Sequence, residues 1–131
     1  MVDTDIILEH LVHGEGSSPL RLLMSGYFCY TTVFNAIEAF SIARSEKEIQ
    51  AVDDAMSAMK VLGLNAKSAK SVGKIFVGDI GDSKGLTLLI AGICIESKLP
   101  ITTMNPGRFS HVKHVHVLPV QRLVGVLRAA I

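Results

Sequence analysis

The feature that most constrains the fold is an uncharged run of ten residues, 86–95 ("LTLLIAGICI"). Every residue in this run is apolar apart from Thr87, near its start, and Gly92. A helix that crosses a bilayer needs roughly 18 or more apolar residues. The run is therefore too short to span a membrane, and we expect residues 86–97 to form a helix buried in a protein core.

The length and composition are typical of one soluble domain. The chain has 131 residues, of which 49% are hydrophobic, and its formal net charge is +1. Its first residues hold Asp3 and Asp5 where a signal peptide would carry cations. We expect a single domain over residues 1–131, a cytoplasmic location, no membrane association, and reduced, buried thiols at Cys29 and Cys94.

Short strand-like and longer helix-like segments alternate along the chain, which favours an α/β domain with a mostly parallel central sheet covered by helices on both faces. Either Thr31 or Thr32 is expected to cap the helix that follows it. The expected strands span residues 1–4, 27–32, 61–64, 99–103 and 114–119. The expected helices span residues 5–12, 19–26, 33–43, 46–60, 65–76, 86–97 and 120–131.

Polar residues end three of the expected strands, at positions 3–5, 31–32 and 102–105. Parallel α/β sheets bind their ligands at the carboxyl ends of the strands. These polar residues are therefore the candidates for a common site.

Four stretches in this order carry a resemblance to a known family: "VDTDIILEHL", "TTVFNAIEAF", "LTLLIAGICIESKLPITTMNPGRF" and the valine-rich strand that follows. Together they resemble the PIN-domain ribonucleases, and in particular the small VapC-type toxins of prokaryotic toxin–antitoxin pairs. The resemblance covers nearly the whole chain and implies a three-layer PIN-like fold.

The resemblance also implies a metal site. PIN domains gather carboxylates that hold Mg²⁺ or Mn²⁺, which activates water for cleavage of an RNA phosphodiester. Here the matching ligands are Asp3, Glu38 and Asp5, and the matching polar residues of the catalytic set are Thr103 and Asn105. Without the family, Asp5 reads equally well as a helix cap, and Glu38 as a carboxylate that points to solvent between apolar neighbours.

The chain departs from the family pattern at Thr87. The family has an aspartate two residues before Leu-Ile-Ala, so threonine stands where the third carboxylate is expected, and the metal site is depleted. Arg108 stands where the family often has Asp or His. Asp79 and Asp82, in the loop before the apolar run, are possible substitutes for the missing acid or simply residues of a solvated turn.

Basic residues supply the expected contacts to RNA phosphate. Residues 55–78 hold four lysines and no acid, and the spacing of three of these lysines places them on one helix face. The same lysines would also suit an ordinary solvated face. The candidate RNA-binding residues are Lys67, Lys70, Lys74, Lys84 and Arg108.

Three functions follow from these patterns. The first is a Mg²⁺- or Mn²⁺-dependent endoribonuclease, the toxin of a toxin–antitoxin pair, with an antitoxin partner and a homodimeric state. The second is a PIN domain that has lost catalysis and serves RNA binding or complex assembly, for which Thr87 is the support. The third, an unrelated flavodoxin-like or receiver-like regulator, lacks the aspartate and lysine that it needs at later strand ends. The apolar stripe of residues 120–127 suits either the core or a subunit interface.

Overall fold

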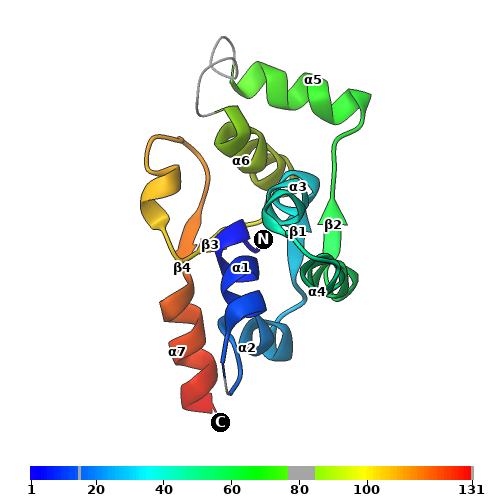
Figure 1. Cartoon of the computed structure of the whole chain (residues 1–131). Coiled ribbons are helices and arrows are strands. Elements are labelled where there is room, and N and C mark those ends of the chain that lie inside the picture. Colours follow the sequence, from blue (N-terminus) through cyan, green and yellow to red (C-terminus); the bar gives the residue numbers. More distant parts are fainter. Residues whose placement is uncertain (15, 77–84, 131) are drawn as a thin grey trace.

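The computed structural model describes residues 1–14, 16–76 and 85–130 as a mixed α/β structure, shown in Figure 1. The described helices are α1 (Thr4–Val12), α2 (Pro19–Gly26), α3 (Val33–Ile42), α4 (Glu46–Ser57), α5 (Ala66–Ile75), α6 (Gly85–Ser97), the short 3-10 helix η1 (Pro106–Phe109) and α7 (Val120–Ala130). The described strands are β1 (Tyr30–Thr32), β2 (Lys60–Leu62), β3 (Ile101–Thr103) and β4 (Val117–Pro119). Each predicted helix is present, with shorter bounds at several ends.

The four described strands pair in parallel, but as two sheets, β1 with β2 and β3 with β4. The predicted first strand contributes one residue, Val2, which bridges to Thr102 and donates its backbone N–H to the Tyr30 carbonyl at 2.7 Å. The prediction of parallel pairing is confirmed. Residues 1–3 link the two pairs through a few backbone hydrogen bonds, including those of Thr102 with Met1 and Asp3, because the chain turns into α1 directly after Asp3.

Helix α6 lies in the core, as its apolar run predicts. Ile90, Ile93 and Cys94 are almost fully buried in a cluster that also includes Val72 of α5. The two helices approach closely at Gly92, where an added Cβ would lie 2.6 Å from Cγ1 of Val72. A larger residue at this position would therefore push the two helices apart.

A second hydrophobic cluster is formed where residues of α1, α2 and α7 pack together. Val120 and Val124 are buried there with Leu20 and Leu23, and Leu127 packs against them. The apolar stripe of the last helix thus packs on the core of its own chain. Both cysteines, Cys29 and Cys94, are buried and free, as expected.

Two predicted strands differ from the structure. The strand expected at 61–64 is instead β2 at Lys60–Leu62, an edge strand on which Val61 is 38% exposed. The strand at 114–119 begins only at Val117, because His114 has a left-handed backbone (φ 70°) that breaks the extended conformation. His114 and His116 are both exposed and do not share a strand face.

Candidate functional site

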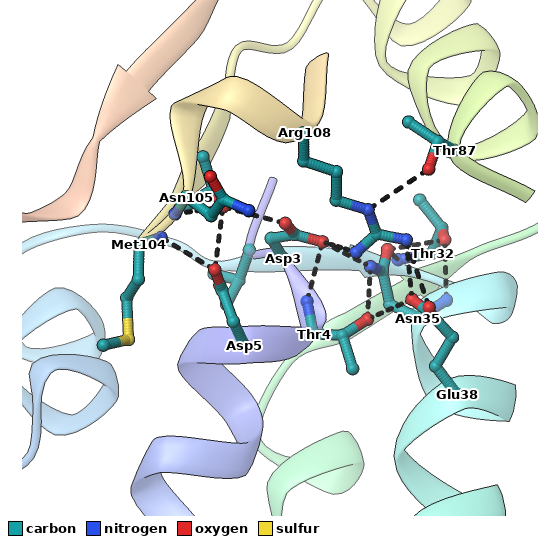
Figure 2. A network of polar contacts seen from close by, with 12 residues as sticks. Asp3, Thr4, Asp5, Thr32, Asn35, Glu38, Thr87, Met104, Asn105 and Arg108 are labelled. Carbon is teal, nitrogen blue, oxygen red and sulfur yellow. Dashed lines mark hydrogen bonds and ion pairs between the residues drawn. The ribbon is translucent and has the colours of Figure 1, made fainter. Parts of the chain in front are cut away.

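Asp3 is the centre of a polar cluster that joins α1, α3, α6, β3 and η1 (Figure 2). Its side chain is fully buried. Its Oδ1 caps α1 by accepting from the backbone N–H of Thr4 at 2.8 Å, and accepts from Nδ2 of Asn35 at 3.1 Å. The same oxygen contacts Nη1 of Arg108 at 2.8 Å. Three N–H donors on one oxygen favour the ionised carboxylate.

Glu38 is brought to the same cluster by α3. A capping box between Thr32 and Asn35 fixes the start of this helix directly after β1. The hydroxyl of Thr4 donates to Oε1 of Glu38 at 2.6 Å and accepts from Nδ2 of Asn35 at 2.8 Å. Glu38 is therefore held toward Asp3 by side chains, so its carboxylate does not simply point to solvent.

Arg108 lies between the two acids. Its Nη2 donates to both oxygens of Glu38 at 3.1 Å, while Nη1 contacts Asp3 and Nε lies 3.3 Å from Oγ1 of Thr87. The Arg108 side chain is 21% exposed, compared with 0% for Asp3 and 24% for Glu38. The contact with Arg108 shows that the hydroxyl of Thr87 faces the cluster.

Asp5 and Asn105 complete the cluster on the side of β3. Oδ2 of Asp5 accepts from the Met104 backbone N–H at 3.0 Å and from the hydroxyl of Thr103 at 3.0 Å. The Thr103 hydroxyl also lies 2.9 Å from Oδ2 of Asp3, and it accepts from the Asn105 backbone N–H at 3.1 Å. Among the described residues, none is a hydrogen-bond partner for the buried Oδ1 of Asp5.

Burial and charge act in opposite directions on Asp3. Desolvation raises the pKa of Asp3 above its ordinary value and outweighs the lowering effects of Arg108, of the Thr103 hydroxyl and of the Thr4 backbone N–H. With all groups ionised, three carboxylates (Asp3, Asp5 and Glu38) and one guanidinium leave a formal charge of −2 in the cluster. Arg108 is therefore an essential counter-charge for the buried acid.

The residues as arranged do not fit a resident Mg²⁺ or Mn²⁺. These ions take oxygen ligands and favour charged carboxylates. Oδ1 of Asp3 and both carboxylate oxygens of Glu38 already accept hydrogen bonds from the Arg108 guanidinium. Thr87, which also contacts Arg108, offers only a neutral hydroxyl. Within the described ranges, no group of three or more His, Cys, Asp or Glu side chains is placed to hold a metal ion.

The structure brings together seven of the predicted site residues. They are Asp3, Asp5, Glu38, Thr87, Thr103, Asn105 and Arg108. Arg108, which was predicted to contact RNA phosphate, forms ion pairs with Asp3 and Glu38 in the structure. Lys67, Lys70 and Lys74 are exposed on α5 and make none of the contacts of the cluster. Asp79, Asp82 and Lys84 lie outside the described residues.

Two residues that link the acids, Thr4 and Asn35, are not among the predicted site residues. For Asn35 a signal existed, because Thr32 and Asn35 have the spacing of a capping box. For Thr4 the only signal was its position between two candidate acids.

No protein-family model matches the chain, and no curated protein matches it. No described helix has both the length and the apolar character that crossing a membrane requires. The fold and the cluster define an α/β protein with an arginine-bridged acid site.

Proposed function

We propose that this chain is a three-layer PIN-like domain of the VapC type that binds RNA without metal-dependent hydrolysis. One observation carries the proposal: the guanidinium of Arg108 bridges Asp3 and Glu38. In a PIN nuclease the corresponding carboxylates would hold the metal ion. Here they are already bound to a cation of the chain itself.

The PIN-like assignment is supported by how the cluster is assembled. Asp3 follows the bridging residue Val2, Glu38 lies in the helix after β1, and Thr103 ends β3. Residues that are far apart in the sequence thus meet at the carboxyl ends of parallel segments, as the resemblance implies.

RNA is the favoured partner because α5 presents an unbalanced positive charge. Lys67, Lys70 and Lys74 are exposed on this helix, and residues 55–78 include no acid. Contacts between lysines and phosphates release counterions, so binding weakens as salt rises. Three such contacts to single-stranded RNA predict a slope of about −2 for log affinity against log salt.

The test uses the purified full chain and a labelled mixture of structured and single-stranded RNAs in Mn²⁺, in Mg²⁺ and in EDTA. We expect binding in all three buffers and no metal-dependent cleavage. Changing Lys67, Lys70 and Lys74 together to Gln should weaken binding and flatten the salt slope. A matched triple variant, with Lys47, Lys113 and Arg122 changed to Gln, removes three exposed cations from elsewhere and should bind as the wild type does.

The second candidate is the metal-dependent endoribonuclease, a cytoplasmic toxin with an antitoxin partner and a homodimeric state. It is favoured by the residual charge of −2 and by Oδ1 of Asp5, which has no hydrogen-bond partner within the described ranges; both would attract a cation. Cleavage in Mn²⁺ or Mg²⁺ that disappears in EDTA and in Asp3→Asn would establish this candidate and overturn the proposal.

A further inference from the structure

We propose that Arg108 and Thr87 form a matched pair of residues that replaces the divalent cation of the acid cluster with an internal guanidinium. The inference rests on the proposed PIN-like class for the expectation of a metal, and on the contacts of this chain for the replacement.

The guanidinium contacts the acids as a bound cation would. It joins residues from two different helices, Asp3 at the start of α1 and Glu38 in α3, through three contacts of 2.8–3.1 Å. Arginine is suited to this role, because its planar fork donates to carboxylates in two directions and its charge persists at any physiological pH. A divalent ion bound between the same oxygens would have to displace it.

Thr87 allows the guanidinium to occupy this position. Its hydroxyl lies 3.3 Å from Nε of Arg108 and adds no charge. An aspartate here would add a further carboxylate to a cluster that already has an excess of negative charge. That carboxylate would favour a divalent ion over a single guanidinium, since cation affinity rises with the number of charged ligands.

The backbone of η1 holds Arg108 in position. The backbone N–H of Arg108 donates to the Asn105 carbonyl at 3.0 Å, and the next residue, Phe109, is almost fully buried. The guanidinium carbon also lies 5.5 Å from the centre of the Phe109 ring. The backbone of Arg108 is therefore held by Asn105, and its guanidinium packs near the ring of Phe109.

A direct titration with Mn²⁺, without RNA, tests the replacement. We expect Arg108→Gln to bind Mn²⁺ at least about tenfold more tightly than the wild type, and Thr87→Asp combined with Arg108→Gln to bind more tightly still. Arg122→Gln, an exposed arginine of α7, is the matched control and should leave the Mn²⁺ affinity unchanged. Circular dichroism checks that each variant is folded.

Equal Mn²⁺ affinity in the wild type and in a folded Arg108→Gln would overturn the inference. A second comparison does not depend on the folding of Arg108→Gln. If the Arg108 guanidinium occupies the place of a metal ion between the acids, Asp3→Asn should leave any weak Mn²⁺ binding of the wild type unchanged. A loss of Mn²⁺ binding in Asp3→Asn would show that the wild type already uses the cluster for metal. Because the titration contains no RNA, its failure is separate from a failure of RNA binding.

Discussion

Removing the positive charge of Arg108 should destabilise the folded protein through Asp3. In Arg108→Gln the buried Asp3 carboxylate loses its nearest cation, and breaking a fully buried ion pair in this way costs about 3–5 kcal/mol. Here Arg108 is 21% exposed and Glu38 24% exposed, so water and rearrangement recover part of the loss. We therefore expect the free energy of unfolding to fall by about 2–3 kcal/mol, a large part of the ~5–15 kcal/mol typical of a domain.

Urea denaturation at neutral pH, followed by circular dichroism, measures this loss. A slope of ~1–3 kcal/mol per molar urea converts it to a midpoint lowered by about 1 M or more. Arg122→Gln, which removes an exposed arginine, should change the stability by no more than about 0.5 kcal/mol.

The decisive result comes from a double-mutant cycle. If Asp3 and Arg108 stabilise each other, combining Asp3→Asn with Arg108→Gln should cost less than the sum of the two single changes, with a coupling energy of about 1–3 kcal/mol. Additivity within about 0.5 kcal/mol would show that the two charges do not interact, and it would refute the reasoning on which the site is built.

Three further predictions concern the pH dependence, the helix packing and the thiols. Burial raises the pKa of Asp3, so the folded protein keeps this proton to higher pH than the unfolded chain does, and the contribution of Asp3 to stability is lost as pH rises from its ordinary pKa through the raised one. In Arg108→Gln the pKa of Asp3 loses the lowering effect of the guanidinium, so the decline of the urea midpoint should extend to higher pH. An unchanged pH profile would contradict this. Gly92→Ala should cost about 1–3 kcal/mol because its Cβ would meet Val72 of α5. Gly73→Ala, around which the described residues leave open space, should instead stabilise its helix by about 0.5–1 kcal/mol. Equal effects of the two changes on the urea midpoint would argue against the close contact between the helices. Burial raises the pKa of Cys94 to about 12, so this thiol should react with a thiol reagent only after unfolding. Mass spectrometry measures the labelling, and fast labelling of Cys94 in the native protein would show that the thiol is accessible.

The helices could be predicted from the sequence because their signals are local. The apolar run predicts the buried helix α6, and the capping residue Thr32 marks the start of α3. Strands of three residues leave too little pattern for this. The sequence therefore predicted a first strand where only Val2 bridges, and a strand through His114 where the backbone turns.

The site could be predicted only in part. Asp3 and Glu38 were predicted because the chain resembles the PIN domains, and Thr87 because it departs from that resemblance; the structure places all three in one cluster. The role of Arg108 escaped, since nothing in the local sequence distinguishes an arginine that contacts phosphate from one that folds inward onto acids. That distinction depends on η1, which is anchored by the burial of Phe109 and directs the arginine toward Asp3.

The separation of Asp3 and Arg108 along the chain has a consequence for the order of folding. Arg108 follows Asp3 by 105 positions. At ~5–20 residues per second, a ribosome needs on the order of 5–20 seconds to make that stretch, and throughout this time Asp3 lacks Arg108 as its partner. Contacts of such long range are also slow to form in the complete chain. The Asp3–Arg108 contact is therefore expected to be among the last to form, after β3 and η1 have been made.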